Sequence, residues 1–422
     1  MGSLVLEMKL IRDPIHGYIE VPDKLLRIVS SPLFQRLRYI KQTALAYMVY
    51  PGMNHTRFEH SLGVMYLSME FFKYIKANSS LDFPLPEHEF IELIGATAML
   101  HDIGHLPFSH TFENALFVAK RVYGLNVFEK DKKTHVILGT KLIEEGFSSE
   151  LERSFKDLGD PVKFISRVLM ETPSNSEEKL ANLIISNFID ADRSDYLLRD
   201  SYYAGVGYGR FDIERLKRFL LFENGMLTVM NKALPIVEQF LLARMYMFQN
   251  VYFHNVVGLY NAILSQAIAH LLRDGYISVP ETPEEFLYFV DNIIFSNLLK
   301  VRKELTNALM YRQGFKRIKI DPSIECIRFL DSMRDEIYED MRVSDGLFVY
   351  HEFNDVPYRE EKDEAVYILS PHGVERLKQV SPLIRSLSEI RKVVFGYHEG
   401  AEKLGRKYER ILSDCESGKE DA

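Results

Sequence analysis

The feature of this sequence that most constrains its fold is an almost uninterrupted apolar run from Ile91 to Leu100. The run contains small residues such as Gly95 and Ala98, which let neighbouring helices approach closely, so it predicts a helix buried on all sides. Such a helix needs several other helices to cover it. The run leads directly into His101 and Asp102, which places two polar side chains at the end of a buried helix.

The rest of the chain is dominated by helical periodicity. Apolar residues recur at helical spacing from Asp23 onward, and we expect further helices at 109–122, 134–147, 161–170, 177–200, 212–222, 235–274 and 284–311. Alternation of apolar and polar residues predicts short strands at 4–11, 316–320, 346–353 and 364–370. The expected fold class is therefore mainly α, with a helical bundle and short N-terminal strands over residues 1–340 and a small α+β appendage over residues 341–422.

Composition excludes several classes of protein. The 422 residues are 46% hydrophobic and 27% charged, which is typical of a globular protein with a sizeable core and not of a disordered chain. The net charge of −8 predicts no general attraction to nucleic acid or to an anionic membrane. We therefore expect neither as a partner, and a phosphate ligand would have to be bound by a local basic pocket.

The cysteines and the N-terminus favour a cytoplasmic location. Cys326 and Cys415 lie far apart and form no CxxC pair, so we expect neither a disulfide framework nor a zinc knuckle, and a reducing compartment fits best. The short N-terminal apolar stretch soon meets Glu7 and Lys9, unlike the apolar core of a signal peptide.

Histidines crowd the first third of the chain close to acidic residues, at positions 55, 60, 101, 105, 110 and 135. The adjacent pair His101 and Asp102 cannot hold a metal ion alone, so His60 and Asp192 are the candidate third and fourth ligands, since both are polar residues on apolar helical segments. Two imidazoles and two carboxylates form a mixed site that suits Mn²⁺, Fe²⁺, Mg²⁺, Ni²⁺ or Zn²⁺. Taken singly, each of these residues is more often a core side chain with its own hydrogen bonds.

Four ordered motifs resemble one known family. They are DPIHGYIEVPDKLLRIVSSPLFQRLRYIKQ at 13–42, PGMNHTRFEHSLG at 51–63, HDIGHLPFSHTFE at 101–113 and IDADRSDYLLRD at 189–200. Together they resemble the HD-domain deoxynucleoside triphosphate triphosphohydrolases. The resemblance implies an all-α catalytic core in which the same four residues named above bind a divalent metal ion.

The resemblance also implies roles for residues around the metal. Its reaction is attack of a metal-activated water on the α-phosphorus of a dNTP, which releases a deoxynucleoside and inorganic triphosphate. By similarity, the triphosphate contacts are Arg57, Arg193 and Tyr196, the sugar contacts are Gln42, Asp200 and Tyr252, and Arg244 and His254 belong to an aromatic-rich helix that flanks the base. The acid, base and orienting groups are His105, His110, Glu113 and His135.

Relatives in this family are often dimers or tetramers. They are activated by a nucleotide effector that binds between the subunits. Residues that align with effector-phosphate positions are Arg38, Arg215, Arg312 and Lys316. By the same resemblance, the C-terminal region serves assembly or regulation. The chain departs from the family where Arg193 replaces Lys, where Val136 follows His135, and where Ser30 replaces an acidic residue that reads guanine.

The sequence is also compatible with two functions other than dNTP triphosphohydrolase activity. The same metal site serves other HD phosphohydrolases, such as nucleotidases and phosphodiesterases, because specificity lies in the pocket. A non-catalytic nucleotide sensor is the third hypothesis. The glycine-rich stretch at 204–212 does not have the spacing of a nucleotide-binding loop and follows a predicted helix, so we interpret it as a connection.

Overall fold

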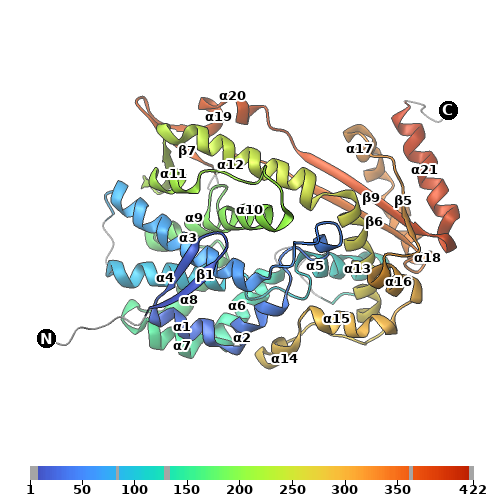
Figure 1. Ribbon diagram of the computed structural model, residues 1–422, viewed down its shortest axis with the longest axis horizontal. Helices are drawn as coiled ribbons and strands as arrows, with labels where there is room; N and C mark the ends of the chain where they lie inside the picture. Colours follow the sequence, from blue (N-terminus) through green and yellow to red (C-terminus); the bar gives the residue numbers. More distant parts are fainter. Residues whose placement is uncertain (1–7, 82–84, 128–133, 361–364, 418–422) are drawn as a thin grey trace.

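The apolar run that precedes His101 forms α4 (Glu87–Leu100), and its residues from Leu93 to Leu100 are buried, as predicted. The structure is a computed structural model that describes residues 8–81, 85–127, 134–360 and 365–417. Helix α4 packs against the long helix α3 (Arg57–Asn78), and Figure 1 shows the two helices next to each other in the half of the molecule that contains the N-terminus. This pair is the centre of the predicted bundle.

Helices make up most of the described chain, which confirms the mainly α fold class. The helices before residue 274, besides α3 and α4, are α1 (Asp23–Ser30), α2 (Pro32–Gln35), α5 (His110–Tyr123), α6 (Thr134–Gly146), α7 (Ser148–Ser154), α8 (Pro161–Leu169), α9 (Ser176–Ile185), α10 (Ala191–Ala204), α11 (Ile213–Arg218), α12 (Leu234–Met247) and α13 (Asn255–Arg273). Those that follow are α14 (Pro283–Tyr288), α15 (Asp291–Asn297), α16 (Lys303–Tyr311), α17 (Ile324–Ser332), α18 (Arg334–Val343), α19 (Leu377–Val380), α20 (Pro382–Arg385) and α21 (Glu402–Glu416).

Several helices predicted as continuous are broken at polar residues. The helix expected at 177–200 divides because the side chain of Asp190 accepts a hydrogen bond from the backbone N–H of Arg193 and so starts α10 as a new helix. The helix expected at 235–274 divides at a π-helical turn, Phe248–Tyr252, after which the His254 imidazole caps α13. The helical spacing of apolar residues continues across both breaks. This spacing alone therefore cannot reveal a helix boundary that a capping side chain sets.

In the described residues, three small sheets accompany the helices. The N-terminal hairpin pairs β1 (Lys9–Asp13) with β2 (Gly17–Val21), and the part of the strand predicted at 4–11 that precedes residue 8 lies outside the described residues. The second sheet has the order β3 (Leu220–Glu223), β4 (Met226–Met230), β7 (Tyr367–Ser370) and β8 (Gly373–Arg376), and the third has the order β5 (Phe315–Arg317), β9 (Ile390–His398) and β6 (Phe348–Asp355).

The sheets tie the C-terminal segment to the helical bundle. Strand β7 pairs in parallel with β4, and the long strand β9 pairs with β5 on one side and with β6 on the other. Figure 1 shows β9 and β6 reaching toward α13 at the end of the molecule opposite the N-terminus. The C-terminal strands therefore lie against the bundle, while the domain boundary that we placed near residue 340 stays a prediction.

The expectation that the cysteines form no disulfide is wrong. Cys326 on α17 and Cys415 on α21 form a disulfide, with their Cα atoms 5.8 Å apart. Both helices pack against β9, which brings together two cysteines that are 89 positions apart in sequence. The spacing of the cysteines could not indicate this pairing, because it depends on the packing of the third sheet.

One described helix, α13, is long and apolar enough to cross a membrane by length and composition. In the structure, 83% of its apolar window is buried inside the protein, where α13 packs against α5, α16 and β6. It is a core helix, and one of its faces lines a cavity.

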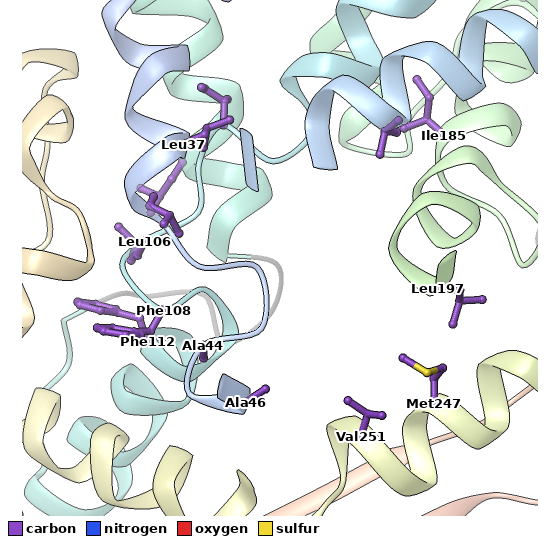
Figure 2. Packing of buried hydrophobic residues seen from close by; sticks show 14 of the residues in the cluster. Leu37, Ala44, Ala46, Leu106, Phe108, Phe112, Ile185, Leu197, Met247 and Val251 are labelled. Atoms are coloured by element: carbon purple, nitrogen blue, oxygen red, sulfur yellow. The ribbon is translucent and has the colours of Figure 1, made fainter. Parts of the chain in front are cut away.

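Figure 2 shows buried apolar residues around this cavity, with Ala44, Ala46 and Phe108 on one side and Ile185 on the other. These residues line a cavity of about 560 Å³, which is large enough for a small organic ligand. The apolar core therefore borders a space that both apolar and polar side chains line.

Candidate active site

Four polar side chains from three helices come together beside the cavity. His60 lies on α3, His101 and Asp102 follow the end of α4, and Asp192 lies in the first turn of α10. His60 Nε2 is 3.0 Å from Asp192 Oδ1 and 3.6 Å from Asp102 Oδ2. His101 Nε2 is 3.3 Å from Asp102 Oδ1 and 3.6 Å from Asp192 Oδ1. The structure therefore gathers the metal-ligand candidates that the sequence named.

The arrangement of these groups fits a divalent metal ion. His101 Nδ1 is 2.6 Å from the carbonyl of Ala98 and donates to it, which leaves Nε2 as the free lone pair, and this buried atom has no hydrogen-bond partner among the described residues. Burial lowers the pKa of His60, but the hydrogen bonds that its ring donates to Asp192 and Asp195 outweigh burial and raise that pKa to about 10. The site thus favours positive charge, and His60, His101 and Asp102 each offer a ligand atom within 4.8 Å of the others.

A buried network of hydrogen bonds and ion pairs contacts His60 on the side of its Nδ1 atom. His60 Nδ1 lies 2.8 Å from Asp195 Oδ2, and His16 Nε2 lies 2.7 Å from Asp195 Oδ1. Arg199 donates from Nε and Nη2 to the two oxygens of Asp195, at 2.8 and 2.9 Å, and from Nη1 to Asp13 at 2.7 Å. The network connects α3 and α10 to the N-terminal hairpin.

Gly63 makes room for this network. A Cβ atom at this position of α3 would lie 1.9 Å from Asp195 Oδ1 and 2.6 Å from Arg199 Nη2, far inside van der Waals contact. Sequence reasoning missed Asp195, Arg199, His16 and Asp13. The spacing of Asp195 and Arg199, four residues apart on one helix, was the available signal.

Arg57 is a cation in direct contact with the metal-ligand candidate Asp102. It is buried, its Nη1 bonds Asp102 Oδ2, and its Nε donates to Ser109 Oγ at 2.7 Å. Burial would raise the pKa of Asp102, yet Arg57, His101 and His105 hold it well below its usual range. A capping box between Thr56 and Glu59 fixes the first turn of α3, where Arg57 lies.

The predicted acid and base residues form one cluster. His110 Nδ1 and His135 Nδ1 each lie 2.8 Å from a different oxygen of Glu113. The His105 ring stacks on the His135 ring with centroids 4.1 Å apart, and His105 Nε2 lies 3.2 Å from Asp102 Oδ1. Burial and the charges of Arg57 and His135 hold the pKa of His105 well below its usual range.

Glu113 orients both imidazoles of that cluster. Burial would raise the pKa of Glu113, but its bonds to His110 and His135 hold it far below the usual range, so it stays a carboxylate. The three histidines line the cavity. His110, Glu113 and His135 also offer ligand atoms within 4.8 Å of one another, but their direct hydrogen bonds account for this grouping without an ion.

The predicted sugar contacts lie together on another part of the lining. Tyr252 donates to Asp200 Oδ2 at 2.6 Å, and His55 Nε2 lies 2.6 Å from Asp200 Oδ1. Gln42, Tyr196, Asp200 and Tyr252 all line the cavity, and Gln42 Oε1 is buried without a hydrogen-bond partner among the described residues. Sequence reasoning counted His55 among the clustered histidines but gave it no role.

Three predicted substrate residues bond elsewhere and do not line the cavity. The guanidinium of Arg193 bonds Asp190 and the carbonyl of Asn187. Arg244 donates to both oxygens of Asp355, at 2.7 and 2.6 Å. His254 accepts from the backbone N–H of Val256 at 3.2 Å and caps α13. Other residues line the cavity without having been predicted, namely Ser109, Asn261, His351 and Phe353.

The predicted effector residues lie on separate elements. Arg38 donates to Gln35 and covers the ring of Phe58, and Arg312 donates to Tyr260 and to the carbonyl of Met48. Arg215 donates to the carbonyl of Lys232, and Lys316 lies on β5. The single chain does not show these four residues in contact with one another.

The fold and this site define a class of protein. A helical bundle that presents a His, His and Asp cluster at a cavity lined by histidines and a buried arginine is the architecture of a metal-dependent phosphohydrolase. Family comparisons agree with this class. Residues 57–199 match the HD domain, and residues 211–413 match the HD associated region.

Individual relatives support the same assignment. An uncharacterized protein of Methanocaldococcus jannaschii is 32% identical over 96% of this chain and 82% of its own length. The deoxynucleoside triphosphate triphosphohydrolase SAMHD1 of Gallus gallus is 36% identical over 50% of this chain, which spans only 36% of that relative. The crystal structure of a hypothetical protein from Aquifex aeolicus, 30% identical, covers 96% of this chain and 100% of its own with a TM-score of 0.75. The chain belongs to the HD-domain phosphohydrolase family.

Proposed function

We propose that this protein hydrolyses deoxynucleoside triphosphates to a deoxynucleoside and inorganic triphosphate. The observation that carries the proposal is the common lining of one cavity by His101, Asp102 and Arg57 and by the hydrogen-bonded pair Asp200 and Tyr252. The first group suits a metal-bound phosphate and the second a sugar hydroxyl. Similarity to dNTP triphosphohydrolases over half of the chain supports the same substrate class.

The metal site would be completed by His60 and Asp192, and a divalent cation there would polarise a phosphate oxygen and activate a water molecule. Arg57 adds a buried positive charge next to Asp102, where charge accumulates on the transferring group. Ser109 holds the Nε edge of Arg57 in place. These residues bind and orient the α-phosphate.

Proton transfer would fall to the histidine cluster. Glu113 is bonded to Nδ1 of both His110 and His135, so the Nε2 atoms are the ones left to exchange protons with a ligand in the cavity. His105 is kept neutral by burial and by Arg57, and its ring supports the His135 ring by stacking. In this proposal His135 donates a proton to the leaving oxygen.

The rest of the triphosphate has fewer partners in the structure than the family resemblance implies. Arg193 and Arg244 would reach it only after leaving Asp190 and Asp355, whereas Tyr196 already lines the cavity. Because both arginines are already paired with carboxylates, a second candidate function is favoured. In it, the same metal site hydrolyses a nucleotide with fewer phosphates or a phosphodiester.

Product analysis separates the two candidates. The metal-loaded protein is incubated with each dNTP singly, with the four dNTPs mixed and with each NTP, and products are resolved by anion exchange. The proposal expects a deoxynucleoside and intact triphosphate, and no hydrolysis by the double variant His101→Ala and Asp102→Ala. Monophosphate with pyrophosphate, or release of single phosphates, would assign the protein to another HD phosphohydrolase. Faster turnover in the mixture would indicate that one nucleotide activates the protein. We would then propose that the phosphates of this nucleotide are bound by Arg38, Arg215, Arg312 and Lys316.

A further inference from the structure

One wall of the cavity comes from the HD associated region. Strand β6 contributes His351 and Phe353 to the cavity, whereas Tyr350, Glu352 and Asn354 line a second hollow on the other side of the strand, which His351 also borders. Helix α13 contributes Val257, Asn261 and Ser265, which are spaced four residues apart and so lie along one face of the helix. This wall is distinct from the residues that would bind the metal and the phosphates.

A series of aromatic rings connects this wall to the predicted sugar contacts. The Tyr252 ring lies 5.0 Å from the Phe248 ring, which lies 5.4 Å from the Phe253 ring. The Phe253 ring stacks on the Phe353 ring at 4.6 Å, and the His351 ring meets Phe353 edge-on at 4.4 Å. All five rings line the cavity. A ligand whose sugar contacts Asp200 and Tyr252 therefore has an aromatic surface next to it.

Two polar side chains of this wall, Asn261 and His351, have groups without a hydrogen-bond partner in the described parts of the chain. Asn261 Oδ1 is buried and has no hydrogen-bond partner among the described residues, although burial of an unpaired amide oxygen is costly. Neither ring nitrogen of His351 makes a hydrogen bond to another described residue. Burial lowers the pKa of His351 to about 4, so near neutral pH its imidazole offers one donor and one acceptor.

We propose that Asn261 and His351 bind the hydrogen-bonding edge of the nucleobase and thereby determine which dNTP is preferred, an inference that rests on the proposed function. Aromatic side chains with a few fixed polar groups suit a nucleobase, because a ring can stack on its faces while the polar groups pair with its edge. A site built to hydrogen-bond its ligand discriminates strongly against one that leaves the polar groups unpaired. The HD associated region thus supplies base selectivity to chemistry carried by the HD domain.

The test compares substrates with and without a base. Asn261→Leu and His351→Phe keep approximate side-chain size and remove the polar atoms, and Asn354→Ala on the other side of β6 is the matched control. For each protein, kcat/KM is measured with the four dNTPs and with 1,2-dideoxyribose 5′-triphosphate, which has no base. Thermal melting of each variant establishes that it is folded.

We expect the wild-type protein to prefer one or two bases. In Asn261→Leu and His351→Phe, the ratio between the best and the worst dNTP falls on the order of tenfold, and the loss in kcat/KM is larger on the preferred dNTP than on the base-free triphosphate. Asn354→Ala keeps the wild-type ratio. A loss that is the same for all five substrates, or a wild-type protein with no base preference, would overturn the inference.

Failure of the proposed function has a different signature. In that case the wild-type protein releases no triphosphate from any dNTP, and the inference is overturned together with the function. If the wild-type protein does release triphosphate and prefers certain bases, but both variants keep its base ratios, the proposed function stands and the inference alone is wrong.

Discussion

His60 Nδ1 lies 2.8 Å from Oδ2 of Asp195, an aspartate that is itself completely buried. A carboxylate at this distance holds a proton on Nδ1 of His60, so that Nε2, which faces Asp192 and Asp102, is the nitrogen that would bind a metal ion. Asp195 therefore selects the ring orientation and the tautomer that a metal ligand requires. Through His16 and Arg199, the same contact depends on the N-terminal hairpin.

Replacing Asp195 with Asn should weaken metal binding. Both oxygens of Asp195 accept hydrogen bonds from Arg199, so an amide nitrogen in either orientation would face an N–H donor and disturb the contact to His60. We expect the dissociation constant for the metal to rise about 10–100-fold, measured by competition with a chelator. The neighbouring Ser194→Ala, whose buried hydroxyl has no hydrogen-bond partner among the described residues, should bind metal as the wild type does. Unchanged affinity in Asp195→Asn would show that the network does not position His60.

Arg244 and Asp355 should stabilise the fold as a pair. Arg244→Ala would leave the largely buried Asp355 without its partner, and we expect it to lower the free energy of unfolding by about 3 kcal/mol. The double variant Arg244→Met and Asp355→Leu should recover most of that loss. Urea unfolding of the single and double variants measures the effect. If Arg244→Ala were as stable as the wild type and only raised KM for dNTP, Arg244 would be a substrate ligand and not a structural one.

The Cys326–Cys415 disulfide should contribute stability but not metal binding. It closes a loop of 89 residues, and opening it with a reductant is expected to lower the free energy of unfolding by about 2–4 kcal/mol. Metal content should not change, because neither α17 nor α21 contributes to the cavity lining. The double variant Cys326→Ser and Cys415→Ser is the control, since its stability should not respond to reductant. Detection of two free thiols in the unreduced, denatured protein would contradict the prediction.

His351 should make stability depend on pH in a defined window. Its pKa in the folded state is about 4, below the ordinary value of 6.5, because burial disfavours the charged imidazole. Between pH 4 and pH 6.5, His351 therefore binds a proton in the unfolded chain but not in the folded chain. Its contribution to the free energy of unfolding is full above about pH 6.5 and is lost as the pH falls toward 4. Relative to His351→Phe, the wild type should lose about 3 kcal/mol over this range, measured by urea unfolding at pH 7 and pH 4. Parallel pH dependence in the two proteins would contradict this.

Local patterns in the sequence were sufficient to predict the elements that hold the candidate metal ligands. The apolar run that ends at His101 predicted a buried helix, and polar residues on apolar segments identified His60 and Asp192 as its partners. The buried helix is confirmed, and the structure brings the four side chains together, because helical burial and a polar residue within it are both visible over a few residues. The breaks at Asp190 and at the π-helical turn before His254 were missed, since the apolar spacing continues across them.

The rest of the site depends on contacts between segments that are distant in sequence. His16 meets Asp195 through the position of a hairpin, and Asp355 meets Arg244 because β6 ends beside α12. Likewise, Asn261 and His351 share a wall only after β6 has packed on α13. No periodicity in the sequence encodes such pairs, so the resemblance placed Arg244 in the substrate site while the structure pairs it with a carboxylate.

The most direct test of the account is the position of oxygen from water in the products of dNTP hydrolysis. The metal-loaded protein is supplied with a dNTP in water enriched in oxygen-18, and the products are analysed by mass spectrometry. Water that attacks the α-phosphorus with loss of the deoxynucleoside leaves one heavy oxygen in the triphosphate and none in the deoxynucleoside, which is the result we predict. Heavy oxygen in a deoxynucleoside monophosphate or in orthophosphate would contradict the account, because it would show a different bond being broken at the site formed by His60, His101, Asp102 and Asp192.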